Sequence, residues 1–151
     1  KSNDTIRVYN IHLQSVGLVG GDYDAVRSGP DTEQSKKLWS RLSSAFSRRS
    51  AQTTVLRASI DSSPYPVILC GDFNDTPVSF ALSTLRSGSP KLFDAFALAG
   101  SGLGSTYVGD IPGLRIDYIM SSSSLEVVSF ETHEIELSDH RPISAVFISN
   151  R

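Results

Sequence analysis

Pro66–Asn74, with the sequence PVILCGDFN, is the stretch that decides the fold. Its first part, Pro66–Cys70, is an uninterrupted apolar run, as expected for a central strand that is buried on both faces. Polar residues follow at once, so Asp72 and Asn74 stand where the strand ends. Catalytic and binding side chains favour loops beyond strand ends. The stretch therefore predicts a buried strand with a polar site at its tip.

The regions around this strand alternate between strand and helix patterns. Ile6–Leu13 is rich in β-branched and aromatic residues, which predicts a strand with a polar end. Apolar residues at helical spacing predict one helix over residues 32–47 and a second over 49–62, which ends before Pro64. Further strand-like runs cover residues 116–120, 125–131 and 142–148. Strands separated by helices predict an α/β (α+β) chain.

Length and composition predict one globular domain. The chain has 151 residues, of which 39% are hydrophobic and 20% charged, as in ordinary soluble proteins. Its 14 basic and 16 acidic residues give a net charge of −2, which differs from the strongly basic footprint of a dedicated nucleic-acid binder. No apolar run of about 18 residues and no targeting segment is visible. The compartment stays unassigned, and attachment to a membrane through preceding sequence stays open.

Asp72 and Asn74 are the first candidates for chemistry. A carboxylate at a strand tip can orient or deprotonate a water molecule, and an amide can donate to a phosphate oxygen. The alternative is ordinary turn chemistry, because Asp and Asn side chains bond their own backbone in Gly-Asp-x-Asn turns.

Asp117, Asp139 and His140 are the second group of candidates. Asp139 and His140 are adjacent, so they point in different directions; Asp139 suits Mg²⁺ as an oxygen ligand, while His140 can face a phosphorus atom. Asp117 interrupts an apolar strand, where an unpaired carboxylate is costly, and His140 is its candidate partner. The alternatives are a plain loop end and an aspartate that faces solvent on an edge strand.

The remaining polar candidates are less specific. His12, at the polar end of the first strand, can donate to the same phosphate, and the Thr106 hydroxyl can face a substrate. His133 has no acidic motif nearby, and we interpret it as structural. We interpret the helical arginines as a solvated outer face, the alternative being contact with an acidic surface or anionic lipid headgroups. They are Arg41, Arg48, Arg49 and Arg57.

The glycine-rich stretch over residues 16–30 predicts a long loop. A loop of this length without secondary structure suggests a lid or a binding loop. Its acidic residues, Asp22 and Asp24, are expected in solvent.

In chain order, the motifs resemble those of the endonuclease/exonuclease/phosphatase superfamily, whose fold is shared with pancreatic-type deoxyribonuclease. The segment Tyr65–Ser79 is most similar to bacterial members of unassigned substrate. The motifs are NIHL (10–13), GDFN (71–74), STY (105–107), RIDYI (115–119) and SDH (138–140). The resemblance implies a DNase-like fold, of which the chain forms half or more: a two-sheet β-sandwich flanked by helices.

The resemblance also implies an activity, the hydrolysis of a phosphoester by in-line attack of an activated water. Asp72 would orient or deprotonate that water, and Asn74 and His12 would hold phosphate oxygens. His140, oriented by Asp117, would stabilise the charge that develops on phosphorus. The implied substrate is a nucleic acid, a phospholipid headgroup or a small phosphorylated molecule. The alternative is a non-catalytic binding module that keeps the fold.

The resemblance finally implies a divalent metal and a partner segment. Asp139 would help to hold Mg²⁺ or Mn²⁺, while the principal metal ligand belongs to an N-terminal half of the family pattern that has no counterpart in residues 1–151. We therefore expect a single partial domain, the C-terminal part of the family domain, with little or no activity alone. We also expect this fragment to associate with itself through the face that the missing half would cover.

Overall fold

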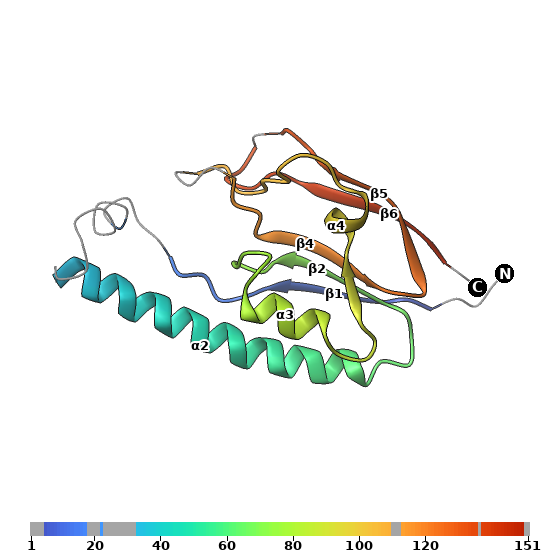
Figure 1. Cartoon of the computed structure of the whole chain (residues 1–151), viewed down its shortest axis with the longest axis horizontal. Helices are drawn as coiled ribbons and strands as arrows, with labels where there is room; N and C mark the ends of the chain where they lie inside the picture. Colours follow the sequence, from blue (N-terminus) through green and yellow to red (C-terminus); the bar gives the residue numbers. More distant parts are fainter. Residues whose placement is uncertain (1–4, 18–21, 23–32, 110–112, 136, 150–151) are drawn as a thin grey trace.

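The computed structural model describes residues 5–17, 22, 33–109, 113–135 and 137–149 (Figure 1). These residues form a mixed α/β structure with two sheets, which confirms the predicted fold class. The elements are β1 (Arg7–His12), α2 (Glu33–Asp61), β2 (Val67–Asp72), α3 (Phe80–Arg86), β3 (Leu92–Asp94), α4 (Ala95–Ala99), β4 (Asp117–Ser122), β5 (Leu125–Thr132) and β6 (Ile143–Ser149).

The larger sheet has the strand order β1-β2-β4-β3. The β2 strand is parallel to β1 and antiparallel to β4, so the predicted central strand is indeed paired on both sides. Its Val67 and Leu69 side chains are fully buried. The β5 and β6 strands form a separate antiparallel pair with a register shift between Val127 and Ser129. In Figure 1, α2 and α3 lie below β1, β2 and β4, and the β5–β6 pair lies above them.

The hydrophobic core lies between the larger sheet and its helices. Ile60 of α2 and Leu82 and Leu85 of α3 pack with Leu69 of β2 and Met120 of β4. Burial of apolar area of this kind is the main stabilising term in folding. It fixes the sheet as a platform, and the polar strand tips extend beyond it.

The α2 helix runs without a break for 29 residues, so the prediction of two separate helices is wrong. The sequence contains no glycine or proline between Pro30 and Pro64 that would end a helix. The buried face also continues through the expected gap, with Ala45, Arg49 and Thr53 all buried. None of the helices in the described ranges is long and apolar enough to cross a membrane.

The interpretation of the arginines as a solvated face is wrong for Arg49 and Arg57, which are 2% and 7% exposed. Arg57 bonds the Asp61 carboxylate at 2.9 Å and donates to the carbonyl oxygens of Leu85 (2.7 Å) and Pro90 (3.1 Å). It thereby ties the end of α2 to the end of α3 and to the turn before β3.

Asp22 is buried and paired with Arg41, which corrects its expected place in solvent. Asp24 and most of the expected loop lie outside the described residues. Arg48 is exposed, as predicted.

Replacing Arg57 with methionine should lower the free energy of unfolding by about 2–4 kcal/mol, because the Leu85 and Pro90 carbonyls would lose a buried charged donor. Denaturant unfolding of the purified variant measures this. Arg48→Met, on the exposed face of the same helix, should stay within about 0.5 kcal/mol of the parent. Equal effects of the two substitutions would contradict the assigned role of Arg57.

Candidate active site

Strand pairing brings His12, Asp72 and Asp117 into one row across the larger sheet. His12 ends β1, Asp72 ends β2 and Asp117 begins β4. The register pairs His12 with Asp72 and Asp72 with Asp117. Neighbouring strands lie about 4.8 Å apart, so the shared row places Asp72 within contact range of both His12 and Asp117. Backbone hydrogen bonding therefore builds the platform of the site.

Gly71 permits the close approach of β2 to β1 just before Asp72. Its φ angle is +132°, and a Cβ atom there would lie 1.9 Å from the Ile11 carbonyl oxygen. Only glycine fits both the conformation and the contact. The glycine of the GDFN motif is thus required for the row to form.

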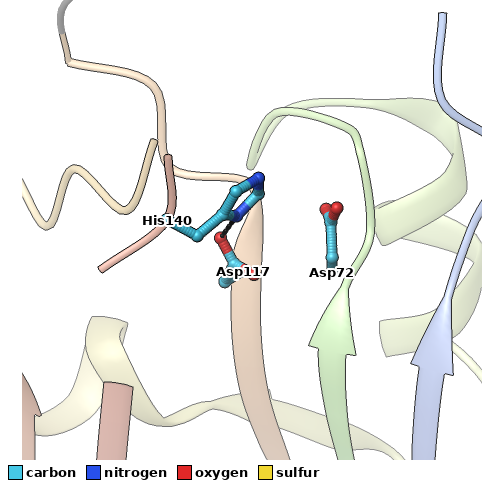
Figure 2. A group of neighbouring side chains, drawn as sticks. All are labelled: Asp72, Asp117 and His140. Carbon is cyan, nitrogen blue, oxygen red and sulfur yellow. Dashed lines mark hydrogen bonds and ion pairs between the residues drawn. The ribbon is translucent and has the colours of Figure 1, made fainter. Parts of the chain in front are cut away.

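His140 joins the row from the loop before β6. A bridge between His140 and Tyr107 fixes the loop, and the two rings meet edge to face at 5.6 Å. His140 Nδ1 lies 2.8 Å from Asp117 Oδ2, which confirms the predicted pair. Figure 2 shows the second ring nitrogen directed away from Asp117, with Asp72 on the neighbouring strand tip.

The surroundings of His140 favour its protonated form. Burial alone would lower the pKa of His140, but the hydrogen bond and charge of Asp117 outweigh it, helped by the charges of Asp72 and Asp139. The net result is a pKa above the ordinary value for histidine. An imidazolium in this position can donate from its second nitrogen to an anionic group.

Asp72 is held by Asn74 on two sides. The Asn74 backbone amide donates to Asp72 Oδ1 (2.7 Å), and its side-chain amide donates to Asp72 Oδ2 (2.8 Å) and to the Leu13 carbonyl (3.1 Å). His12 Nε2 lies 3.4 Å from Asp72 Oδ2. Because the Asn74 amide is engaged within the protein, Asn74 here positions Asp72 and offers no free donor to a phosphate, contrary to the expected role.

The Asp72 carboxylate has a raised pKa. Burial raises it most, the Asn74 backbone amide lowers it, and the nearby charge of Asp117 raises it again; His140 and His12 act in the lowering direction. A raised pKa makes the carboxylate a better proton acceptor. This property suits a group that takes a proton from water.

Thr106 was expected to face a substrate, but its side chain is buried. It is fully buried, and its hydroxyl oxygen accepts hydrogen bonds from the backbone amides of Ile116 and Asp117, each at 3.1 Å. A hydroxyl with no exposed surface cannot contact a substrate in this conformation. Thr106 instead fixes the backbone from which Asp117 projects.

Asp139 is exposed and lines the cavity into which Asp72 and His140 also project. The Ser138 hydroxyl donates to Asp139 Oδ1 at 3.0 Å. His133 lies outside the cavity lining, with Nε2 2.9 Å from the Ser144 hydroxyl, which agrees with its structural interpretation.

The site opens into a cavity of about 770 Å³. His12, Asp72, Asn74, Asp117, Asp139 and His140 form its polar side. Its lining also includes Phe46 and Arg49 of α2, which sequence reasoning did not assign to the site. The signal available in the sequence was the spacing of Arg49, which lies one helical turn after Ala45 and therefore on the buried face of α2. The volume admits a phosphate together with an organic group.

Residues 9–140 match the sequence model of the Endonuclease/Exonuclease/phosphatase family. The chain belongs to this family. A Bacteroides vulgatus endonuclease/exonuclease/phosphatase has a similar structure, with 26% identity and a TM-score of 0.60 over 69% of this chain and 45% of that one. No curated protein matches this chain.

Two other similar structures show the same fold at lower identity. A mannosyl-6-phosphatase of Bacteroides thetaiotaomicron is 19% identical, with a TM-score of 0.57 over 68% of this chain and 46% of that one. A family protein of Leptotrichia buccalis is 21% identical, with a TM-score of 0.58 over 98% and 51%. The chain thus spans about half the length of these structures.

The donors of this family member suit a hard divalent cation. Among the described residues, Asp72, Asp117 and His140 offer ligand atoms within 4.8 Å of one another, and Asp139 is not in this group. His140 Nδ1 and Asp117 Oδ2 already bond each other, and both Asp72 oxygens accept hydrogen bonds from Asn74, so each of the three side chains has a partner within the protein. Mg²⁺ takes one or two protein carboxylates and fills its other positions with water and phosphate. Asp72 and Asp139, which both line the cavity, are carboxylates of the kind that such an ion binds.

Asp117→Asn should lower the pKa of His140, because it removes the charge that raises the pKa and leaves the burial that lowers it. The imidazolium would then lose its proton at a lower pH than in the parent. An NMR titration of the histidine ring signals measures this. Glu131→Gln, beside His133, should leave the His140 titration unchanged. An unaltered His140 titration in Asp117→Asn would contradict the pairing.

Proposed function

We propose that the intact protein is a metal-dependent phosphoester hydrolase and that this chain supplies the side of the site that orients water and contacts phosphate. The observation that carries the proposal is the row of His12, Asp72 and Asp117, with His140 bonded to Asp117, at the edge of one cavity. Asp72 and His140 line the same cavity, where a carboxylate can take a proton from water and an imidazole N–H can donate to a phosphate oxygen. Family membership supports the same conclusion.

Asp72 orients the attacking water and accepts its proton as the new oxygen–phosphorus bond forms. The bond from phosphorus to the ester oxygen breaks on the opposite side, and the leaving oxygen takes up a proton from solvent or from an acid of the complete site. His140 donates from its second ring nitrogen to a phosphate oxygen, while Asp117 holds the ring in place. His12, which is largely exposed, donates to another phosphate oxygen.

A bound Mg²⁺ or Mn²⁺ would neutralise charge on the phosphate. Asp139, which lines the cavity, is the residue of this chain that would help to hold it. Burial raises the pKa of Asp72 most, and the charge of Asp117 raises it further, so a cation bound nearby would stabilise the ionised carboxylate.

We also propose that a second segment completes the site. The chain spans 45% of the first matched structure, so much of that domain has no equivalent here. The principal metal ligand and part of the substrate surface would come from this segment, and the described chain alone would have little or no activity. Without it, the apolar side chains exposed on β5 and β6, among them Val128, Val146 and Ile148, would favour self-association.

His140→Ala and Asp72→Asn should each lower phosphoester turnover of the intact protein by about 10²–10⁴-fold, the usual contribution of positioned acid–base groups. The assay uses bis-nitrophenyl phosphate as a diester and nitrophenyl phosphate as a monoester, with Mg²⁺ and with a chelator. His133→Ala is the matched control, because this histidine lies outside the cavity.

Chelator should abolish turnover, and the ester that is hydrolysed faster identifies the substrate class. The described chain alone should show little turnover in the same assay. Full activity of the His140→Ala and Asp72→Asn variants would refute the assigned roles. Binding of phosphoesters by the intact protein without any turnover would identify a non-catalytic module.

A further inference from the structure

Arg49 of α2 is the most deeply buried charged side chain of the cavity lining, with 2% exposure. Burying a guanidinium is unfavourable unless carboxylate and carbonyl partners compensate for lost water. Arg49 Nε donates to Asp75 Oδ2 at 3.0 Å, and Nη1 donates to the Gln14 carbonyl oxygen at 2.8 Å. The Arg49 guanidinium carbon also lies 4.8 Å from the centroid of the Phe46 ring, and this contact further restrains the arginine side chain.

These two partners lie on the loops that carry the site. Asp75 directly follows Asn74, and Gln14 comes two residues after His12. Gln52, one helical turn beyond Arg49, accepts from the Gln14 backbone amide at 3.0 Å. Two side chains on one face of α2 therefore hold the loop after β1, and Arg49 joins that loop to the loop after β2.

The loop after β2 needs such support because Asn74 adopts a φ angle of 50°. The left-handed region is unfavourable for residues other than glycine, although asparagine tolerates it better than most. Asp75 is fixed on further sides: its Oδ1 accepts from the Thr76 amide at 3.0 Å, and the Tyr118 hydroxyl donates to its carbonyl oxygen at 2.9 Å. Asn74, anchored by Asp75, in turn holds both oxygens of Asp72.

We propose that Arg49 is a positioning residue of the active site, which acts through Asp75 and Gln14 to set the geometry of Asp72, Asn74 and His12. The kinetic consequence rests on the proposed hydrolase function, whereas the structural consequence does not. Lysine cannot replace Arg49, because one ammonium cannot reproduce the two directed bonds of the guanidinium.

Arg57 provides the matched control. It is a second buried arginine of α2 that bonds a carboxylate and backbone carbonyls, but its partners are Asp61, Leu85 and Pro90, none of which lines the cavity. Arg49→Lys and Arg57→Lys therefore remove similar interactions from one helix. Only Arg49→Lys removes contacts with the loops that follow β1 and β2.

The test measures amide hydrogen exchange and steady-state kinetics on the intact protein, well below the melting temperature of each variant. Arg49→Lys should accelerate exchange of the Asn74 amide, which is bonded to Asp72, and lower kcat for the phosphoester by about tenfold or more with little change in KM. Arg57→Lys should lower the melting temperature while leaving Asn74 exchange and kcat close to the parent values. If Arg49→Lys fails to fold, Asp75→Asn tests the same contact from its other end.

Unchanged Asn74 exchange in the Arg49 and Asp75 variants would overturn the proposal, whether or not the parent hydrolyses phosphoesters. Equal loss of kcat in Arg49→Lys and Arg57→Lys would also overturn the proposal, because Arg49 would then contribute only to the overall stability of the fold. A parent without turnover, combined with faster Asn74 exchange in Arg49→Lys, would support the positioning role and refute the hydrolase function alone.

Discussion

The pairing of Asp72 with His12 on one side and Asp117 on the other is the constraint on which the site depends. This register is possible because Gly71 lets the β2 backbone approach β1 without a clash at the Ile11 carbonyl. A slip of one residue would turn every side chain of β2 to the opposite face and separate the row. The site is therefore a consequence of strand pairing, and the buried apolar residues of β2 fix that pairing.

The polar groups around this row compensate one another. Asp117 bonds His140 and, against the lowering effect of burial, raises the pKa of its ring, and Asn74 holds Asp72 by its backbone and side chain. Burying a polar group costs free energy unless the group is hydrogen-bonded. These contacts therefore lower the free-energy cost of placing the polar side chains of the site close together. The site thus brings the Asp72 carboxylate at a strand tip within 4.8 Å of the His140 ring, which projects from the loop before β6.

The sequence predicted the central strand and the polar residues at its tip from a local apolar pattern. It predicted the Asp117–His140 pair, 23 residues apart, because a carboxylate inside an apolar strand needs a partner. It did not predict the burial of Arg49 and Arg57, which bond Asp75 and Leu85 across 26 and 28 residues of sequence. Thr106 was placed wrongly for a related reason, because its hydroxyl accepts from the backbone amides of Ile116 and Asp117, and backbone donors are the same for every residue type. Hydrogen bonds made across the fold leave no periodic pattern to detect.

The most direct measurement of the central claim is an NMR titration of the intact protein with orthovanadate in the presence of Mg²⁺. An anion that resembles the transferred phosphoryl group should shift the signals of His12, Asp72, Asn74 and His140 together, along one binding curve. The signals of His133 and Ser144 on the β5–β6 side should stay unchanged. Shifts confined to α2 or to the β5–β6 pair, without any response from the row, would contradict the account.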